Sequence, residues 1–413
     1  MKFYFPDSQD MISPTYDFVH DEYSPYRVRQ RDDQYAHEVL TPLPYDGILV
    51  SKAIVDGSVR GAGKYTGAQR ERLYRFGVRK FFRLPDCIDT LGDCGAFNYA
   101  SEDLPPYTID EVLDFYERCG FDAGVSVDHV IFGYAAAADD ATADPAWVRR
   151  REISLQCAED FLRACRRRRS RIEPVGAAQG WSPASYADSV HRLQQMGYRR
   201  IALGGMVPLR SDDILACLRQ IASTGGHRPQ LHLLGITRVR DMAQFAALGV
   251  TSFDSTSPFR QAFMDDRDNY HTATGSYVAV RVPQVDANPV LKRRILAGHV
   301  SQRNAIAAER RCLQLLRSYD RGDADLGEVV AALGSYERVL GAKTSYLSDY
   351  TRTLADCPWA DCPCSLCNKH GIEIVIFRGT ERNKRRGFHN LAVFAERVHQ
   401  LGLPTVVSRS DHG

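Results

Sequence analysis

Short apolar runs rich in β-branched residues recur along the chain, separated by stretches with helical periodicity. The runs cover residues 46–50, 78–84, 123–131, 172–178, 200–203, 231–234 and 250–253. The intervening stretches carry apolar residues at the three-and-four spacing of amphipathic helices, at 110–119, 185–196 and 212–221. Strands that alternate with helices in this way predict a parallel sheet built from βαβ units. The pattern indicates seven strands, one fewer than a closed (β/α)8 barrel contains.

Polar or glycine residues follow nearly every expected strand. They are Asp128 with His129, Gln179 with Gly180, Gly204 with Gly205, Gly235, and Asp254. In a (β/α)8 barrel the carboxyl ends of all the strands open at one mouth, where the active site is built. A doubly wound sheet would bring far fewer strand ends together. The sequence therefore predicts an α/β fold, a (β/α)8 TIM-type barrel with a polar mouth.

Length and composition agree with a water-soluble barrel protein. The chain has 413 residues, of which 44% are hydrophobic and 25% charged, and such barrels commonly exceed 250 residues. The first residues, MKFYFPDSQD, lack the apolar stretch of a signal peptide, and no later segment offers 18 uninterrupted apolar residues. Most of the 11 cysteines are scattered singly, as in a reducing compartment. We expect a cytoplasmic protein without a membrane partner.

The basic residues are clustered, although the formal net charge is only +2. The clusters lie at 149–151, 166–169 with Arg171, 292–294, and 384–386. Each could neutralise backbone phosphates of a nucleic acid, or could simply be a solvated helix face. We expect Lys384 to Arg386 to contact phosphate, because this cluster lies closest in sequence to the metal-binding motif described next.

Four residues near the C-terminus have the composition of a structural zinc site. Cys362, Cys364 and Cys367 form a C-x-C-x2-C motif, and His389 precedes the last expected helix. Three thiolates and one imidazole complete a zinc tetrahedron and leave no position for a catalytic water. Cys357 could replace one of the three thiolates, and unmetallated cysteines are the alternative. We expect one structural Zn²⁺ that contributes folding energy to this part of the chain.

The pattern changes from about Asn304 onward. Amphipathic helices are expected at 304–319 and 326–340, followed by the cysteine motif, a β-like run at 372–377, a basic loop and a closing helix that ends near Gly402. We expect a catalytic barrel over 1–345 and a zinc-binding subdomain with the closing helix over 346–413, packed on the barrel.

Five short segments, together with the cysteine motif, resemble one family in their order along the chain. They are LGDCGAFNY around Asp93, VSVDHV around Asp128, AAQG around Gln179, ALGGMVPL around Gly204 and SFDST around Asp254. The family is that of the tRNA-guanine transglycosylases, zinc-containing barrels that exchange a guanine in a nucleic acid for a modified guanine. The resemblance covers roughly residues 92–391 and is weak before them.

The resemblance implies that Asp254 is the nucleophile and Asp93 the acid/base partner. The reaction requires the same groups, because breaking an N-glycosidic bond with retention needs one carboxylate to trap C1′ and a second group to donate and accept protons. The alternative for Asp254 is an N-cap or turn residue, and the neighbouring motifs favour the functional role.

The resemblance also implies a guanine pocket. Asp128 and Gln179 would read the base, the backbone of Gly204 and Gly205 would contact its O6 atom, and Phe97 and Leu234 would sandwich it. One carboxylate can accept hydrogen bonds from the N1–H and N2–H2 donors of guanine together, which suits Asp128. The alternative for Asp128 is a strand-end aspartate that binds nearby amides.

Departures from the family pattern indicate the branch. Queuosine-type enzymes carry a glutamate shortly after the glycine pair to accept a cationic aminomethyl group, whereas here GGMVPLRS has no acid before Asp212. GGxVPL is similar to the archaeosine-type enzymes, which use the neutral nitrile base 7-cyano-7-deazaguanine (preQ0) but extend through RNA-binding domains. Cys94 stands where the family usually has a serine, and Asn98 where it has a glutamine. The DNA-modifying branch remains, and it implies exchange of guanine in DNA for preQ0 through a covalent aspartyl-glycosyl intermediate.

The expected partners are DNA, a free 7-deazaguanine base and a companion protein that opens or nicks the duplex, because a stacked guanine must leave the helix before it reacts. One alternative is a tRNA-guanine transglycosylase, which shares every catalytic residue. Another is a non-catalytic, zinc-containing nucleic-acid-binding subunit, which would be expected to have lost the nucleophile. A barrel hydrolase with an incidental zinc is the third.

Overall fold

The computed structural model describes residues 1–6, 9–57, 63–224 and 228–402. The chain divides into two compact units. The barrel unit comprises the described parts of Met1–Ser8, Tyr45–Thr256 and Val398–Gly413, and the second unit comprises Gln9–Pro44 and Ser257–Arg397. The expected boundary between residues 345 and 346 falls inside the second unit, between two of its helices.

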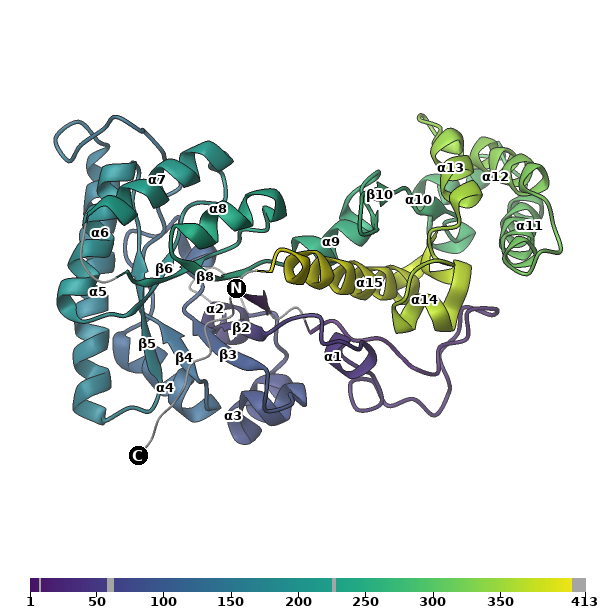
Figure 1. The fold of residues 1–413 in the computed structure, drawn as a ribbon. Helices are drawn as coiled ribbons and strands as arrows, with labels where there is room; N and C mark the ends of the chain where they lie inside the picture. The colour runs from purple at the N-terminus through teal and green to yellow at the C-terminus, as the bar shows by residue number, and fades with distance from the viewer. Residues whose placement is uncertain (7–8, 58–62, 225–227, 403–413) are drawn as a thin grey trace. The chain divides into compact units, whose positions relative to one another are not determined.

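The barrel unit contains a closed barrel of eight parallel strands in the order of the sequence (Figure 1). The strands are β1 (Lys2–Pro6), β2 (Gly47–Ser51), β3 (Asp89–Asp93), β4 (Ala123–Val125), β5 (Glu173–Ala178), β6 (Arg200–Leu203), β7 (Gln230–Leu233) and β8 (Val250–Asp254). β1 closes the barrel, since Tyr4 lies opposite Gly47 of β2 and Asp254 of β8. The predicted (β/α)8 fold is confirmed.

Helices follow the strands of the barrel. They are α2 (Lys52–Asp56), α3 (Gly67–Phe82), α4 (Ile109–Cys119), α5 (Pro145–Arg168), α6 (Pro183–Met196), α7 (Ser211–Ser223) and α8 (Met242–Ala247). Their ends are encoded locally: Thr108 and Glu111 form a capping box at the start of α4, and Gly120 ends it in the left-handed conformation. The three helices predicted between strands are therefore confirmed as α4, α6 and α7.

Glycines in the strands let a helix approach the barrel wall. Gly92 of β3 and Gly124 of β4 flank the ring of Tyr116 on α4, and a Cβ atom at either position would lie 2.4 Å from that ring. The Tyr116 hydroxyl then donates a hydrogen bond to the Val125 carbonyl at 2.9 Å. β3 thus has few large apolar residues because its outer face receives an aromatic ring.

Two strand expectations need correction. Residues 78–84 are not a strand but lie at the end of α3, where Val78, Phe81 and Phe82 are buried at helical three-and-four spacing. The run predicted at 123–131 is a strand only over Ala123–Val125. β1 and β3 were not predicted, since β3 reads DTLGD, without a β-branched apolar run. The other five predicted strands are confirmed within one or two residues.

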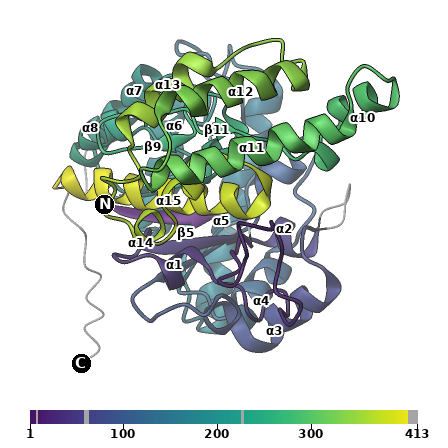
Figure 2. The ribbon, with the colours of Figure 1, turned by 90° about the vertical axis from the view of Figure 1, so that its right-hand side faces the viewer.

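The second unit is mainly helical. Its helices are α1 (Ala36–Val39), α9 (Ser257–Met264), α10 (Pro289–Leu296), α11 (Gln302–Asp320), α12 (Leu326–Leu340), α13 (Leu347–Asp356), α14 (Ser365–His370) and most of α15 (Gly379–Gln400). α11 and α12 pack side by side in both views (Figure 2). They confirm the predicted helices at 304–319 and 326–340.

Short strands and a 3-10 turn connect these helices. β9 (Tyr270–His271) pairs antiparallel with β10 (Ser276–Tyr277), and β11 (Val280–Arg281) pairs parallel with β12 (Ile376–Phe377). The β-like run expected at 372–377 is therefore a strand only at its end, after the 3-10 turn Gly371–Ile374. The prediction of a basic loop before the closing helix is wrong, because residues 384–386 lie within α15. Within the described ranges, no helix is both long and apolar enough to cross a membrane.

Buried arginines join the segment 9–44 to the rest of the second unit. Asp21 accepts a hydrogen bond from Arg378 Nε at 2.6 Å and also pairs with Arg382. Arg382 Nε donates to Glu373 Oε2 at 2.6 Å. Buried ion pairs of this kind are destabilising unless every charge is matched. Residues 9–44 therefore supply the carboxylate and carbonyl partners that these arginines require.

Candidate active site and metal centre

Asp93 ends β3 at the mouth of the barrel. Its register partner on β2 is Ser51, whose hydroxyl donates to Asp93 Oδ2 at 2.8 Å. Burial raises the pKa of Asp93 to about 7, the charges of Asp128 and Asp254 add to this rise, and the Ser51 hydrogen bond opposes it. The three carboxyl groups are thus close enough to interact electrostatically. A carboxyl group with a pKa near neutrality can both give and take a proton.

Asp128 follows β4 and is held by two donors. Cys94 Sγ donates to Asp128 Oδ1 at 3.1 Å, and Gln179 Nε2 donates to Asp128 Oδ2 at 2.5 Å. The Tyr99 hydroxyl contacts Cys94 Sγ at 3.0 Å and the Asp128 carbonyl at 3.1 Å. Burial raises the pKa of Asp128, and the hydrogen bonds from Cys94 and Gln179 counteract that rise. The carboxylate is oriented before any ligand arrives.

The glycine pair after β6 gives Gln179 its space. A Cβ atom on Gly204 would lie 2.2 Å from Gln179 Nε2, and one on Gly205 would lie 2.2 Å from the Ile131 carbonyl oxygen. Gly205 also has a φ of +74°, which disfavours any side chain. The Tyr186 hydroxyl donates to the Gly204 carbonyl at 2.8 Å. Backbone thus forms this part of the mouth, and a ligand can approach it closely.

Asp254 ends β8 and accepts two hydrogen bonds through one oxygen. His232 Nε2 lies 3.2 Å from Asp254 Oδ1, and the Gly235 backbone N–H donates to the same atom at 3.1 Å. The other ring nitrogen, His232 Nδ1, lies 2.8 Å from Ser252 Oγ. Burial lowers the pKa of His232, so its ring is neutral and carries one N–H. Because a carboxylate only accepts, that hydrogen is on Nε2, and Ser252 donates to Nδ1.

Sequence reasoning missed His232 and Ser252, although a signal was present. Each precedes a predicted site residue by two positions, His232 before Leu234 and Ser252 before Asp254. Alternation along a strand places residues two apart on the same face. Pairing of β7 with β8 then sets His232 opposite Ser252.

The two residues expected to sandwich a base have different environments. Phe97 lies in the 3-10 helix Ala96–Tyr99, is 74% exposed, and meets the ring of Phe132 edge-on with centroids 5.6 Å apart. Leu234 follows β7, is partly buried and packs against the apolar barrel interior around Val175 and Ala202. An exposed aromatic ring at the mouth is available to stack on a planar ligand.

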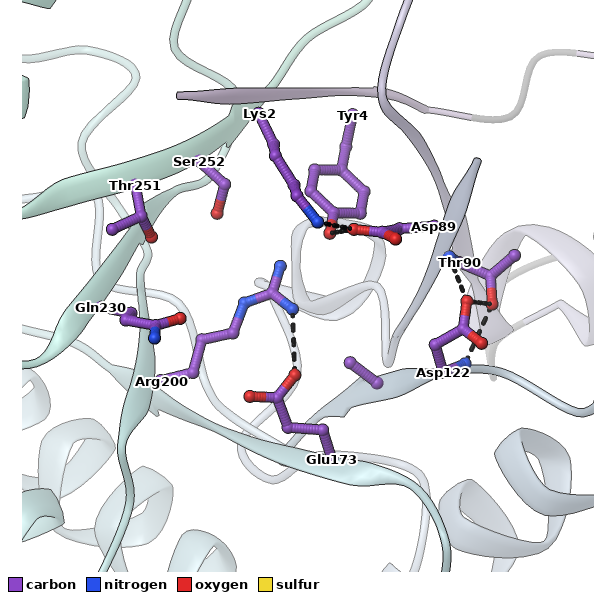
Figure 3. A pocket seen from close by; sticks show the side chains of 11 residues that line it. Lys2, Tyr4, Asp89, Thr90, Asp122, Glu173, Arg200, Gln230, Thr251 and Ser252 are labelled. Atoms are coloured by element: carbon purple, nitrogen blue, oxygen red, sulfur yellow. Dashed lines mark hydrogen bonds and ion pairs between the residues drawn. The ribbon is translucent and has the colours of Figure 1, made fainter. Parts of the chain in front are cut away.

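The barrel also has a cavity of about 150 Å³ at its opposite end. Figure 3 shows its lining, which comes mainly from the first residues of the strands. Lys2 Nζ lies 2.5 Å from Asp89 Oδ2, the Tyr4 hydroxyl donates to the same oxygen at 2.9 Å, and Arg200 Nη1 lies 3.4 Å from Glu173 Oε2. These charges satisfy one another. The amino-terminal end of a barrel usually serves stability rather than catalysis, and these pairs fit that role.

The predicted metal ligands converge in the second unit. Cys362, Cys364, Cys367 and His389 place one ligand atom each within 4.8 Å of one another. His389 Nδ1 lies 3.5, 3.5 and 3.4 Å from the three sulfur atoms. A tetrahedral zinc with ordinary bond lengths requires S···N separations of about 3.6 Å. The four side chains therefore have the spacing of a closed metal site.

The surroundings fix the ligand orientation. His389 Nε2 lies 2.8 Å from the His271 carbonyl oxygen, so it donates there and leaves the Nδ1 lone pair toward the sulfur atoms. Tyr270 stacks on the His389 ring with centroids 4.2 Å apart. Cys357 is not among the four grouped ligands, and its Sγ donates instead to the Leu354 carbonyl at 2.9 Å.

The expected phosphate contacts of Lys384 to Arg386 are wrong. Arg385 and Arg386 are 1% and 0% exposed, and Arg386 donates to the Ala262 carbonyl at 2.6 Å. Lys384 Nζ lies 3.1 Å from Asp10 Oδ1. Two of the three cations face inward because α15 packs inside the second unit, and their charge is not available to a nucleic acid.

A parallel eight-stranded barrel with three interacting aspartates at its mouth, in a chain that also carries a Cys3His cluster, defines a (β/α)8 protein suited to acid–base and nucleophilic chemistry. No protein-family model matches the chain. A DNA-guanine transglycosylase of Salmonella montevideo is 48% identical to it over 404 residues, which are 96% of each protein. The chain therefore belongs to the tRNA-guanine transglycosylase family, in its DNA-modifying branch.

Proposed function

We propose that this protein exchanges guanine in DNA for preQ0 through a covalent intermediate on Asp254. The observation that carries the proposal is the Asp254 carboxylate, which His232 and Gly235 hold at one oxygen at the same mouth as Asp93. Both hydrogen bonds end on Oδ1, and within the described ranges Oδ2 accepts none, so this second oxygen suits attack on a sugar carbon. The name and high identity of the Salmonella relative support DNA as the polymer.

The two carboxyl groups account for both halves of the exchange. Asp254 attacks C1′ of the target nucleotide as the C1′–N9 bond breaks, and protonated Asp93 supplies the proton that the departing guanine needs. The incoming base then loses its N9 proton to the Asp93 carboxylate, and N9 attacks C1′ to release Asp254. Protons balance over the cycle, and two inversions at C1′ give retention. The pKa of about 7 for Asp93 suits this double role.

Base recognition is assigned to the network around Asp128. Its carboxylate would accept the N1–H and N2–H2 donors of guanine, while Cys94 and Gln179 hold it in place. The Gly204 and Gly205 backbone would contact O6, because no side chain obstructs it there. Phe97 and Leu234 would lie on the two faces of the base.

The choice of the nitrile base rests on the segment after the glycine pair. Residues 204–211 contain no acid. Beyond them Asp212 is exposed on the first turn of α7, and the carboxylate of Asp213 lies 3.4 Å from Arg210 Nε. An aminomethyl ammonium would lose hydration there without gaining a carboxylate partner, which costs several kcal/mol. A nitrile carries no charge and avoids this cost.

The remaining parts of the proposal concern metal and partners. Cys362, Cys364, Cys367 and His389 would hold a structural Zn²⁺, which would stabilise the fold around α14 and α15 and take no part in the exchange. The substrates are DNA and the free base. A companion protein that opens or nicks the duplex would remove the cost of unstacking the guanine.

Incorporation of radiolabelled preQ0 into duplex DNA, single-stranded DNA or tRNA tests the proposal. Cell extract is added in a parallel set to supply a companion protein. We expect label in DNA with the wild-type protein, none with Asp254→Asn, and wild-type incorporation with Asp160→Asn, whose carboxylate is 46% exposed on α5.

Denaturing gels without incoming base should show a protein–DNA adduct that Asp254→Asn fails to form. Label that enters tRNA but never DNA would make this a tRNA enzyme. An adduct that persists in Asp254→Asn would overturn the nucleophile assignment.

A further inference from the structure

Apart from the cluster at 292–294, each of the basic clusters that the sequence singles out is partly neutralised or buried within the fold. Arg151 pairs with Asp140 at 2.6 Å, and Arg168 lies 2.5 Å from both Asp110 and Asp114. Arg385 and Arg386 are buried inside the second unit. The cluster at 292–294 differs because, among the described residues, no carboxylate pairs with any of its three cations, and α11 adds further exposed arginines.

Helices α10 and α11 present a run of unneutralised cations. The exposed members are Lys292, Arg293, Arg303, Arg310 and Arg311, named here the α10–α11 basic surface. The only acid between residues 289 and 311 is Glu309, which is 9% exposed and accepts from Arg378 Nη2 at 2.7 Å. Within the described part of the chain, no carboxylate pairs with Lys292, Arg303 or Arg310. The surface therefore keeps its positive charge.

The geometry of α11 arranges two of these cations in a line. Arg303 and Arg310 are seven residues apart, which places them on one face of the helix about 10 Å apart along its axis. With Ile306 and Ala307 between them, they line a surface hollow of about 500 Å³. The opposite face carries the buried residues Ala305, Cys312 and Leu316. The inner face therefore holds the helix in place while the outer face is free to bind.

We propose that the α10–α11 basic surface binds backbone phosphates of the DNA substrate, an inference that rests on the proposed function. Arginines at this spacing on a rigid helix can each meet a phosphate, and Lys292 extends the surface onto α10. Such contacts position a nucleic acid without reading its sequence. None of these residues belongs to the barrel mouth, so the α10–α11 basic surface would bind DNA without taking part in the base exchange.

A charge-matched pair of variants tests this inference. The first carries Lys292→Gln, Arg303→Gln and Arg310→Gln. The control carries Arg169→Gln, Arg171→Gln and Arg199→Gln, which removes the same charge from three exposed positions that precede β5 and β6. Binding of fluorescently labelled duplex and single-stranded DNA is measured by anisotropy over a series of salt concentrations, and circular dichroism checks that both variants fold.

We expect the first variant to bind DNA roughly 10-fold or more weakly, with a salt slope lowered by about 2 to 3, since each phosphate contact contributes about 0.9. The control should stay within about twofold of wild type. With saturating DNA, the first variant should exchange base at the wild-type rate, so that KM rises and kcat does not.

Wild-type DNA affinity and salt slope in the first variant would overturn the inference while leaving the proposed function standing. An equal loss in both variants would also overturn it, because the effect would then depend only on net charge.

If the wild type modifies tRNA alone, the proposed function fails. The anisotropy series on tRNA then shows separately whether these residues bind RNA, and dependence of tRNA but not DNA binding on them would overturn the assignment to DNA.

Discussion

At the scale of single residues, His232 is a buried neutral ring that holds Asp254, the proposed nucleophile. Ser252 donates to Nδ1 and so fixes the tautomer in which Nε2–H points at Asp254. The ring is fully buried and meets Tyr4 edge-on with centroids 5.6 Å apart, which prevents it from turning away. In the proposed reaction His232 is therefore a positioning residue that acts through Asp254.

Replacing this ring should separate orientation from binding. His232→Leu leaves Asp254 with the Gly235 N–H alone, and loss of a hydrogen bond to a charged group, worth about 1.5–3 kcal/mol, corresponds to about a 10- to 100-fold slower adduct formation. His232→Gln can restore a donor near the Nε2 position and should recover much of the rate. Single-turnover kinetics measure both, with DNA affinity as the control. Adduct formation at the wild-type rate in the leucine variant would refute the positioning role.

Asp93 links activity to pH and to stability. Burial and the neighbouring carboxylates raise its folded pKa to about 7, above the ordinary value of 3.8. Between about pH 4 and pH 7 the unfolded chain has released this proton while the folded protein keeps it, so folding stability falls as pH rises through that window. Above pH 7 the folded protein carries the unfavourable charge in full.

The variant Asp93→Asn removes that charge. It should turn over poorly, yet its thermal stability relative to wild type should be higher at pH 8 than at pH 5. The pH–rate profile of the wild type should show an inflection near 7 that the variant lacks. Thermal melts at the two pH values provide the measurement, and an equal stability difference at both would contradict the raised pKa.

At the scale of elements, α14 and α15 are joined through the Cys3His cluster. Cys364 caps α14 by accepting from the Cys367 N–H at 3.4 Å, and His389 lies within α15. Asn390, the next residue, accepts from the His271 N–H at 3.0 Å and donates to the Asn269 carbonyl at 3.2 Å. Two helices and the strand β9 thus meet at one small centre.

Removal of two thiolates should therefore release the metal and loosen this region. We expect the double variant Cys364→Ser, Cys367→Ser to contain no zinc and to lose hydrogen-exchange protection in β9, α14 and α15 before the barrel strands. Cys357→Ser is the matched control, since Cys357 lies outside the cluster, and it should keep one zinc per chain. Elemental analysis measures the metal, and full zinc content in the double variant would contradict the ligand assignment.

At the scale of the whole molecule, two units divide the proposed tasks. The barrel unit contains every residue assigned to base exchange, from Asp93 to Asp254, and the second unit contains the metal cluster and the α10–α11 basic surface. The net charge of +2 does not reveal the basic surface. Acids elsewhere in the chain cancel its charge in the total, and several of them pair with other arginines, such as Arg168 and Arg382. Net charge alone is therefore a poor guide to nucleic-acid binding in this protein.

Local signals in the sequence were enough for much of the architecture and for the polar residues at several strand ends, whereas Asp93 was indicated only by the family resemblance. Alternating strands and helices indicated the barrel, the polar residues at strand ends marked its mouth, and C-x-C-x2-C marked the metal cluster. These features depend on periodicity and spacing within a few residues. The strand β3 and the helical end of α3 could not be predicted in this way. Gly92 makes room for the ring of Tyr116 and Phe82 is buried in the core, so both residue types reflect tertiary packing and not a local preference.

Only the tertiary structure decided which charged groups are free and which side chains meet. Whether Arg386 binds phosphate or a buried carbonyl depends on Ala262, more than a hundred residues away in sequence. The contact of His232 with Asp254 exists because the pairing of β7 with β8 shifts register between Leu231 and His232, which sets His232 opposite Ser252 within the closed barrel. Secondary structure follows from local preferences, whereas pairing of charges and hydrogen bonds follows from long-range packing that no short stretch of sequence contains.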